Sequence, residues 1–531
     1  MKIYKGETML FLLKRKIRRL IGFMKPVPQC FYDFAKLNSP WWKDVELPDK
    51  SNGNILYVDR KPFPLAMVIT MPVVKKIADE QKKRIIIGLP YVHNNKQTKM
   101  MYSSYGVDDY ITIDTAPWYM WIYFAYKALK IIYARDGVNK LLNLSYKEVK
   151  FGEELYDAII RGANGLYTLN KLKLKYLSTI MNAYVNVYNA NKFFSCEHNI
   201  LVYGDCDYEV KGWPKMAIHY NRKCYEVDYT CIVEHQEHKE NKVLNGGKLT
   251  KEIYEQSLRE ITPKKLEQFL QKHFCGGNEN YLDRCAYYHK KKYSKEKLYE
   301  DLNVVDRKKK NILVAAHTFS DSPHYGYNMI FKDYFEWLFQ TIKILQGNDK
   351  INIFVKEHPT AYHYDETGSV AYYIKKYNMS NIYVLPQDFN TISAFSIMDA
   401  VVTCQGTVGL EATIYGIPVF TASQGYYYGF GIDNNSKTLE EYTYKMLHIT
   451  EYPKPTELQI QTAKEVLYLT RKKGEMKREI REIDDMDVKL NWQHPDVFVA
   501  QCQEINKKLL KGVTPKEGYE GLLDNIRIMH D

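Results

Sequence analysis

The sequence lacks the features of several protein classes. Its 531 residues include nine cysteines, an odd number with no CxxC pair. This favours a reducing compartment over a disulfide scaffold and gives no support for a zinc site. No stretch reaches the roughly 18 consecutive apolar residues that a membrane-spanning helix needs. The nearest, residues 116–126, predicts a buried helix. We expect no secretory signal, because basic residues interrupt the apolar residues of the first segment.

The composition is that of a globular protein of more than one domain. Hydrophobic residues make up 45% and charged residues 26% of the chain, which is ordinary for soluble domains, and the length predicts two or three of them. With 75 Lys and Arg against 63 Asp and Glu, the net charge is +12. Such a surface suits an anionic substrate, an anionic membrane or nucleic acid. No recognised nucleic-acid motif is present, so a non-catalytic polyanion-binding protein is kept only as an alternative.

Residues 1–30 predict a basic amphipathic helix. Apolar residues recur at helical spacing from Leu10 to Met24, and the gaps between them hold five basic residues, Lys14, Arg15, Lys16, Arg18 and Arg19. Such a helix can lie in an anionic membrane interface. Packing on the protein's own surface would give the same periodicity. We expect a cytoplasmic protein, with this helix as its means of reaching the inner face of the cytoplasmic membrane.

Alternating strand and helix patterns predict an α/β fold of GT-B type, in which two Rossmann-like domains face an interdomain cleft. The first domain is expected over residues 50–232, with strands at 55–58, 84–90, 110–114, 200–204 and 223–227. The second is expected over residues 311–436, with strands at 312–316, 351–355, 381–385, 400–403 and 418–421. We interpret residues 233–310 as a helical connector or insertion and residues 437–531 as C-terminal helices.

Three polar loops follow strands of the second domain. Ligands of open α/β sheets bind beyond the carboxyl ends of the strands, so these loops are the candidate site. They cover residues 316–324, 356–359 and 403–412. The candidate ligand-binding or catalytic residues on them are His317, Ser320, Asp321, Lys356, His358, Pro359, Gln405, Gly406, Thr407, Gly409 and Glu411.

The loop at 403–412 has two interpretations. Gly406 and Gly409 can let the backbone approach a ligand, and Thr407 can cap the following helix, whose N-terminus attracts a phosphate. Glu411, one turn inside that helix, can accept hydrogen bonds from ribose hydroxyls. Alternatively, this is a capped helix in which glycines allow close packing on the strands.

The loop at 356–359 carries a cation and an imidazole. Lys356 and His358 are two residues apart on an extended chain and can point to one side, while Pro359 stiffens the exit. Together they could hold a nucleotide phosphate and protonate a leaving group. Because Lys356, His358 and a helix N-terminus can neutralise a phosphate, we expect neither a metal nor another cofactor.

Carboxylates of the first domain are candidates for the chemistry at the acceptor. Asp205, Asp207 and Glu209 follow the strand that ends near Tyr203, and Asp59 follows the first strand. A retaining transfer needs a carboxylate nucleophile, and an inverting transfer needs a general base. The residues leave this choice open, and each acid could equally be a cap or a surface charge.

The polar loops carry a family resemblance. The segments HTFSDSPH (317–324), VKEHP (355–359) and QGTVGLEATIYGIPVF (405–420) resemble capsule-synthesis glycosyltransferases with a GT-B fold, in particular the retaining β-Kdo transferases of bacterial capsules. Bacterial sialyltransferases and CDP-glycerol glycerophosphotransferases share the His-Pro motif more distantly. The resemblance is strongest over residues 311–432, and a looser match covers residues 148–157.

The resemblance implies transfer of a sugar, such as a Kdo-like acid, from a CMP-linked donor to a glycan or lipid-linked acceptor. It implies that His358 contacts the donor phosphate, that Gly406 and Thr407 frame it, and that Glu411 meets the ribose. The acidic-acidic-glycine motif of sialyltransferases is missing, although Asp108-Asp109 and Asp205-Cys206-Asp207 offer carboxylates. The catalytic carboxylate therefore stays open, with Asp321, Asp205 and Asp207 as the candidates. A sugar-nucleotide epimerase or hydrolase of the same fold is the alternative enzyme.

Overall fold

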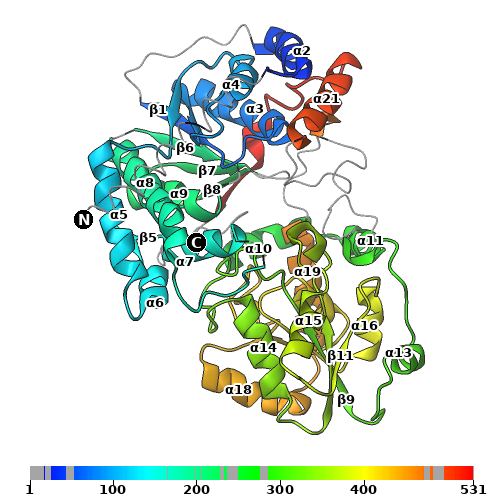
Figure 1. Cartoon of the computed structure of the whole chain (residues 1–531). Coiled ribbons are helices and arrows are strands. Elements are labelled where there is room, and N and C mark those ends of the chain that lie inside the picture. Colours follow the sequence, from blue (N-terminus) through cyan, green and yellow to red (C-terminus); the bar gives the residue numbers. More distant parts are fainter. Residues whose placement is uncertain are drawn as a thin grey trace. The chain divides into compact units, whose positions relative to one another are not determined.

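The computed structural model describes residues 17, 26–42, 53–163, 165–196, 198–204, 206–227, 232–235, 249–275, 285–471, 479–481 and 496–529 (Figure 1). Nearly all of the predicted N-terminal helix and Asp205 lie outside these residues. The chain forms two compact units. The first contains residues 1–159, 169–247 and 473–531, and the second contains residues 160–168 and 248–472.

The first unit is built on a seven-stranded sheet with the order β15-β8-β7-β6-β1-β2-β3. Its strands are β1 (Asn54–Val58), β2 (Arg84–Leu89), β3 (Tyr110–Thr112), β6 (Ile200–Tyr203), β7 (Cys224–Val227), β8 (Ile232–His235) and β15 (Ile526–Met529). All neighbours run parallel except β7 and β8. The first strands of the chain therefore form the predicted Rossmann-like sheet.

Helices cover this sheet because its strands are apolar on both faces. In β1, residues 55–58 are all buried, as expected for a central parallel strand. The helices are α2 (Gln29–Asn38), α3 (Pro64–Gln81), α4 (Lys96–Ser103), α5 (Trp118–Ile132), α6 (Gly137–Leu142), α7 (Gly152–Arg161), α8 (Leu177–Phe194), α9 (Gly212–His219) and α21 (Val497–Leu510).

The C-terminal segment differs from the prediction of helices alone. It contains α18 (Leu439–Leu447), α19 (Glu457–Arg471) and α21, but it ends in β15, which pairs in parallel with β8. Helix α21 packs on α2, where Cys502 Sγ lies 3.2 Å from the carbonyl oxygen of Cys30. A four-residue edge strand gives too short an alternation for recognition from sequence.

The second unit contains a six-stranded, fully parallel sheet with the order β11-β10-β9-β12-β13-β14. Its strands are β9 (Lys310–Ala315), β10 (Ile351–Lys356), β11 (Ile382–Val384), β12 (Ala400–Thr403), β13 (Val419–Thr421) and β14 (Asn434–Asn435). The other helices are α10 (Lys251–Ser257), α11 (Pro263–Phe274), α13 (Lys295–Asp301), α14 (Tyr334–Leu345), α15 (Ser369–Lys376), α16 (Thr391–Ile397) and α17 (Val408–Ile414).

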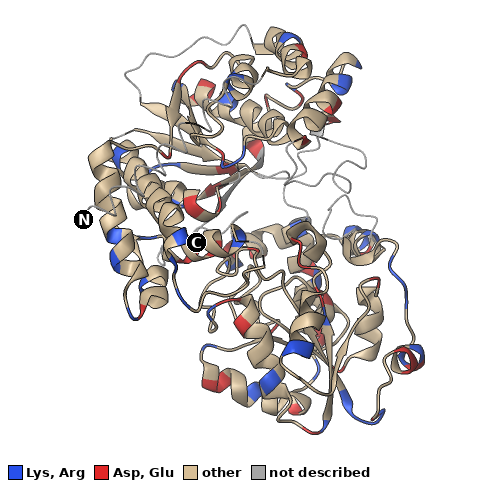
Figure 2. Ribbon diagram, in the orientation of Figure 1, with Lys and Arg blue, Asp and Glu red and all other residues tan. Residues whose placement is uncertain are grey.

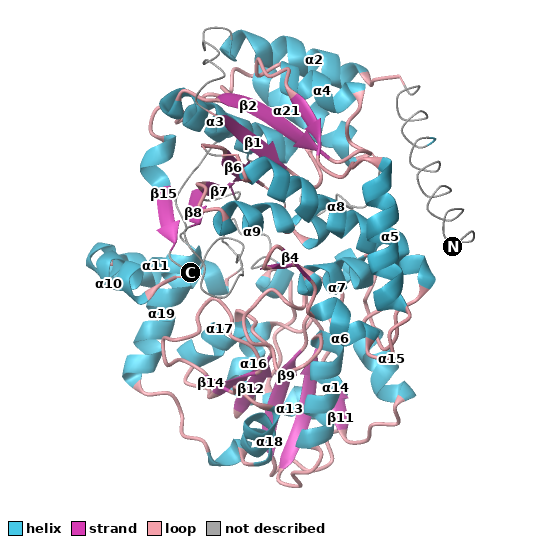
Figure 3. Cartoon of the chain, turned by 90° about the vertical axis from the view of Figure 1, so that its left-hand side faces the viewer, coloured by secondary structure: helices cyan, strands magenta, loops and turns pink. Residues whose placement is uncertain are grey.

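Alternate residues of β9 enter separate cores on the two faces of the second sheet. Ile312 and Val314 join the cluster that includes Trp337 of α14. Leu313 joins the opposite cluster with Phe395 of α16. Helices thus flank the strands, drawn magenta in Figure 3. The predicted α/β class with two Rossmann-like domains is confirmed.

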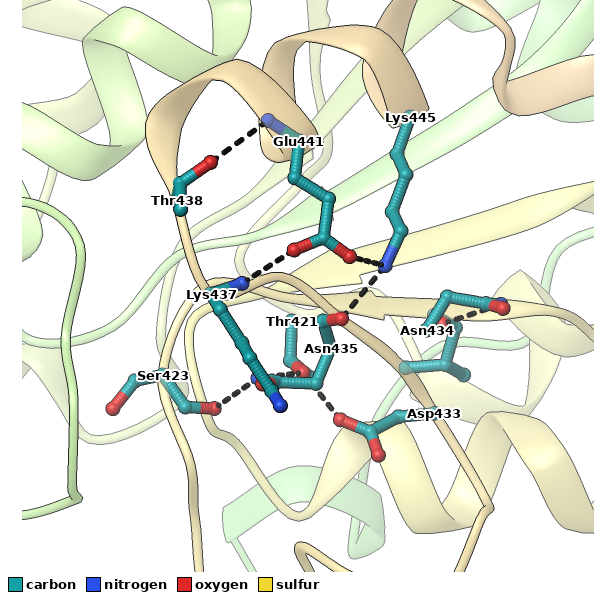
Figure 4. A network of polar contacts seen from close by, with 10 residues as sticks. Thr421, Ser423, Asp433, Asn434, Asn435, Lys437, Thr438, Glu441 and Lys445 are labelled. Atoms are coloured by element: carbon teal, nitrogen blue, oxygen red, sulfur yellow. Dashed lines mark hydrogen bonds and ion pairs between the residues drawn. The ribbon is translucent and has the colours of Figure 1, made fainter.

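Side chains hold the short edge strand β14 in place (Figure 4). The Thr421 hydroxyl donates to Asp433, and Asn435 Nδ2 donates to Thr421 Oγ1 over 2.9 Å. From α18, Lys445 Nζ donates to the Asn435 carbonyl over 2.7 Å and pairs with Glu441 at 2.8 Å. Polar side chains therefore supply bonds that a two-residue strand cannot make with its backbone alone.

Candidate functional site

The three predicted polar loops leave the second sheet at the same edge. Strand β9 lies between β10 and β12, and all three are parallel. Ala315 is in register with both Lys356 and Thr403, so the loops begin at the same height. The structure therefore brings the candidates on these loops together, as predicted.

His317 lies at the centre of this edge. Its Nε2 accepts a hydrogen bond from the Gln405 amide over 3.3 Å and lies 3.3 Å from Thr403 Oγ1. The ring stacks on Tyr334 at a centroid distance of 4.2 Å and lies 6.4 Å from the nearly parallel ring of His358. Burial, followed by the charge of His358, lowers the pKa of His317 to about 3. His317 is therefore a neutral acceptor that joins two of the loops.

His358 has a defined tautomer. The Thr360 amide donates to His358 Nδ1 over 3.3 Å, and the Thr360 hydroxyl lies 2.8 Å from the same nitrogen. Because a backbone amide can only donate, the neutral ring carries its proton on Nε2. Burial and the neighbouring charge of Lys356 lower the pKa of His358 to about 4. At neutral pH the imidazole can donate a hydrogen bond, but it holds no second proton to transfer.

Lys356 is a buried cation. Its side chain forms no hydrogen bond or ion pair with another described residue, and the residue is 7% exposed. Burial, and then the charge of Lys290, lower the pKa of Lys356 to about 8, although the charges of Glu411 and Glu357 oppose this shift. A buried ammonium without a bonded anion is costly. An anion bound next to Lys356 would therefore be electrostatically favourable.

The Glu of the Lys-Glu-His-Pro motif has a structural role. Glu357 accepts hydrogen bonds from the amides of Gly368 and Val370, over 2.9 and 3.3 Å, where α15 begins. It also accepts from Gln387 Nε2 over 3.1 Å. A carboxylate at a helix N-terminus is electrostatically favourable. Glu357 thus fixes the loop from which Lys356 and His358 extend.

The loop at 403–412 supports the packing interpretation for its glycines. A Cβ on Gly409 would lie 2.3 Å from the Tyr427 hydroxyl, and one on Gly406 would lie 2.9 Å from Thr403 Oγ1. The Tyr427 hydroxyl donates to the Gly406 carbonyl over 3.0 Å. Both glycines are therefore needed for the close packing of this loop, whether or not a ligand approaches it.

The prediction that Thr407 caps α17 is wrong. Its side chain makes no capping hydrogen bond, because Oγ1 accepts instead from Tyr426 over 3.0 Å and from Arg471 over 3.4 Å. The backbone amides of Thr407 and Val408 have no acceptor within the described part of the chain. This turn can therefore offer backbone donors to an anion.

The side chains of Gln405 and Glu411 both form hydrogen bonds within the second unit. Gln405 Nε2 donates to Tyr334, and Gln405 Oε1 accepts from Ser423 over 3.2 Å. Glu411 Oε1 lies 2.8 Å from Nε2 of His273, which is fully buried on α11. No sequence motif pointed to His273, since the sequence suggested only a connector there. Gln405 thus positions the loop, and Glu411 has only its second oxygen left for a ligand.

The predicted ligand residue Ser320 is bound to a carboxylate that sequence reasoning missed. Glu366 accepts from the Ser320 hydroxyl and amide over 2.6 and 2.9 Å and from the Phe319 amide over 2.6 Å. Burial raises the pKa of Glu366 to about 6, and these hydrogen bonds oppose the shift. Asp321, half-buried beside them, adds a like charge. Ser320 therefore anchors the loop that carries His317 and Asp321.

A cavity of about 550 Å³ lies in the same unit. It is lined by Leu270, Gln271, Phe274, Cys275, Tyr287, Lys290, Lys292, Asn390, Ile392, Ile414 and Tyr415. The Tyr287 ring lies 5.6 Å from that of His273, the partner of Glu411, and the charge of Lys290 acts on Lys356. Three aromatic residues and two lysines are among its lining residues, and its size is within the range of small-molecule sites.

The candidate carboxylates of the first unit have partners there. Asp207 lies 3.6 Å from Lys211 Nζ, and buried Asp59 accepts from the Tyr57 hydroxyl over 3.1 Å and the Lys61 amide over 2.9 Å. Asp205 lies outside the described residues. A catalytic role for Asp205 or Asp207 stays a prediction.

Neither a metal cluster nor a membrane-spanning helix is found in the described residues. They contain no group of three or more His, Cys, Asp or Glu side chains that could hold a metal ion. Within the same residues, no helix is both long and apolar enough to cross a membrane.

Glu366 leads to a prediction about stability. Because its folded pKa is raised, the folded state binds the proton more tightly than the unfolded state, so this contribution to stability falls as pH rises from about 4.5 to 6. Relative to Glu366→Gln, the wild type should lose about 2 kcal/mol across this window. Urea unfolding over the pH range measures this difference.

The control for this test is Ser320→Ala, which removes one hydrogen bond to Glu366 but keeps the titrating group. It should retain the wild-type trend with pH. Stability curves of wild type and Glu366→Gln that run parallel from pH 4 to pH 7 would contradict the assignment.

Comparisons with known proteins agree with the resemblance of the loops. Residues 227–478 match the family described as "Capsule polysaccharide biosynthesis protein". A stretch of 128 residues, 24% of this chain, is 27% identical to the capsule polysaccharide modification protein LipA of Neisseria meningitidis serogroup A. The match spans only 17% of that relative's length.

Two solved structures are similar at low identity. The β-Kdo 2,4 transferase KpsC of Thermosulfurimonas dismutans is 15% identical, with a TM-score of 0.30, over 50% of this chain and 78% of that one. The UDP-GlcNAc 2-epimerase of Neisseria meningitidis is 10% identical, with a TM-score of 0.25, over 79% of this chain and 97% of that one. The predicted resemblance to capsule-synthesis proteins is confirmed over residues 227–478, the matched stretch, which contains the candidate site.

Proposed function

We propose that the chain is a glycosyltransferase of bacterial surface-polysaccharide synthesis. It transfers a sugar from a nucleotide-linked donor, with a Kdo-like acid on CMP as the first choice, to a glycan or lipid-linked acceptor. The observation that carries this proposal is the largely buried side chain of Lys356, which has no bonded anion among the described residues. The similarity to capsule biosynthesis proteins supports it.

The donor phosphate is held by groups that all donate or carry positive charge. Lys356 supplies the charge, His358 donates from Nε2, and the amides of Thr407 and Val408 add two neutral donors. When the bond between sugar and phosphate breaks, negative charge grows on the phosphate. Donors fixed in advance around that position stabilise this charge. No metal or other cofactor is needed for this step.

The nucleoside occupies the neighbouring cavity. Aromatic walls formed by Phe274, Tyr287 and Tyr415 suit a planar base. The free oxygen of Glu411 is the acceptor for a ribose hydroxyl, while its other oxygen stays with His273. This arrangement keeps the ribose role predicted for Glu411 and adds the aromatic cavity to it.

The acceptor chemistry rests on a carboxylate. Asp321 follows the anchored residue Ser320 on the loop of His317, and Asp207 and Asp205 are the candidates from the first unit. One of them acts as nucleophile in a retaining transfer or as base in an inverting one. The enzyme works in the cytoplasm, with its glycan or lipid-linked acceptor as the partner besides the donor.

The identity of the nucleotide can be tested by thermal unfolding. A nucleotide that binds only the folded state adds about 2.7 kcal/mol of stability at 100 times its Kd. We expect CMP to raise the Tm of the full chain more than CDP, UDP or GDP. A response to UDP alone would redirect the donor assignment, and no response to any nucleotide would overturn the proposed function.

His358 gives a test of transfer. His358→Ala should abolish transfer from CMP-Kdo to a glycan primer because it removes a donor to the phosphate, while the Tm without ligand stays near that of wild type. The assay is run with and without primer. Donor turnover that does not depend on the primer would identify a hydrolase or epimerase, and full transfer by His358→Ala would refute the assignment.

Lys356 leads to a prediction about pH. Since its folded pKa is about 8, its charge is present below pH 8 and is lost as pH rises through that value. Nucleotide affinity, measured by calorimetry, should then fall by up to about tenfold per pH unit above pH 8. Lys356→Met should bind weakly without this trend. Lys308→Gln, which removes an exposed lysine that does not line the cavity, should keep it.

A further inference from the structure

Helix α5 exposes an apolar face that no described part of the chain covers. Trp118 is 71% exposed, Tyr126 64%, Tyr119 55%, Tyr123 46% and Ile122 41%. The prediction of a buried helix over residues 116–126 is therefore wrong for this face. Contiguous exposed apolar residues of this kind mark an interaction surface. We call these five residues the aromatic face of α5.

The other side of α5 is fixed in the first unit. Phe124 is fully buried and stacks on Tyr184 of α8, with centroids 5.3 Å apart and rings inclined by 6°. Trp121 is buried beside it and donates from Nε1 to the Ala116 carbonyl over 3.1 Å. Figure 1 shows α5 beside α8. These contacts prevent α5 from turning its aromatic face inward.

The charge along α5 is of one sign. Residues 115–135 contain no Asp, Glu, Asn or Gln, and their charged residues are Lys127, Lys130 and Arg135. Figure 2 accordingly shows α5 without acidic residues. Lys127 Nζ lies 4.9 Å from the centroid of the Tyr123 ring, so cationic and aromatic groups share this surface. Its partner must accept both apolar and positively charged groups.

We propose that the aromatic face of α5 docks on an anionic lipid bilayer. Trp and Tyr favour the headgroup region, where their rings are partly buried and their polar atoms stay hydrated. A helix with aromatic residues on one face and lysines beside them lies in the plane of that region. Lys127, Lys130 and Arg135 supply the attraction to anionic headgroups.

A polysaccharide is the other partner that aromatic residues could recognise. Sugar hydroxyls need hydrogen-bond acceptors and donors beside the stacking rings, usually carboxylates and amides. Residues 115–135 carry none of these side chains. The observations therefore favour the membrane. The contact is separate from the predicted N-terminal helix and independent of the donor nucleotide.

The test is co-sedimentation of the full chain with vesicles of phosphatidylcholine, with and without phosphatidylglycerol. Wild type should bind the anionic vesicles, and Trp118→Ser/Tyr126→Ser should bind them about tenfold or more weakly, since it removes two aromatic anchors. The matched control is Tyr372→Ser/Tyr444→Ser, which alters tyrosines that are 58% and 59% exposed in the second unit. This control should bind like wild type.

Fluorescence assigns the contact to α5. Brominated lipids in the vesicles should quench part of the wild-type tryptophan emission, and this part should be lost in Trp118→Phe, which keeps an aromatic ring and still binds. The shift in Tm with CMP should be the same in all α5 variants. Failure of the membrane contact is thereby distinguished from failure of the proposed function.

Three results would overturn the proposal. The first is unchanged vesicle binding by Trp118→Ser/Tyr126→Ser. The second is binding that disappears when residues 1–25 are removed although α5 is intact. The third is wild-type binding to a soluble anionic polysaccharide but not to vesicles, with loss in the α5 double variant, which would identify a glycan surface instead.

Discussion

The candidate site depends on a lysine whose side chain is largely buried at the end of a strand. Lys356 ends β10 in the interior of a parallel sheet, and its ammonium has no bonded anion in the described residues. Burial disfavours the charged form and lowers the pKa of Lys356 to about 8. A phosphate at this position would remove the cost. The proposed phosphate binding would therefore draw part of its free energy from pairing this charge.

Several polar side chains near Lys356 hold the backbone of the site loops in place. Glu357 fixes the start of α15, Glu366 fixes the loop of Ser320, and Gln405 bridges Tyr334 and Ser423. The bonds of Glu366 and Gln405 are buried, so the groups they satisfy would otherwise be costly. A polar residue in a site loop is thus more often a positioning residue than a ligand. The groups left for an anion are Lys356, His358 and two amides.

The sequence was sufficient to predict most strands of the two sheets and the edge at which the loops meet. The length and hydrophobic pattern of the apolar segments predict β9, β10 and β12. In a parallel sheet the carboxyl ends of these strands lie at one edge. It could not predict Glu366 or His273, because their importance comes from contacts 46 and 138 residues away along the chain. It also misjudged α5. Hydrophobicity identified the helix, but only packing on α8 shows which of its faces remains exposed.

The two histidines constrain how charge can build up at this edge. The rings of His317 and His358 lie 6.4 Å apart, and burial holds both pKa values far below neutrality. Were both protonated, two imidazolium ions would lie beside Lys356 in a poorly hydrated space. The free site avoids this by keeping one cation and two neutral rings. Only an anion between them can raise the pKa of His358 toward the range in which it transfers a proton. The proposed proton donation by His358 would therefore depend on a bound anion.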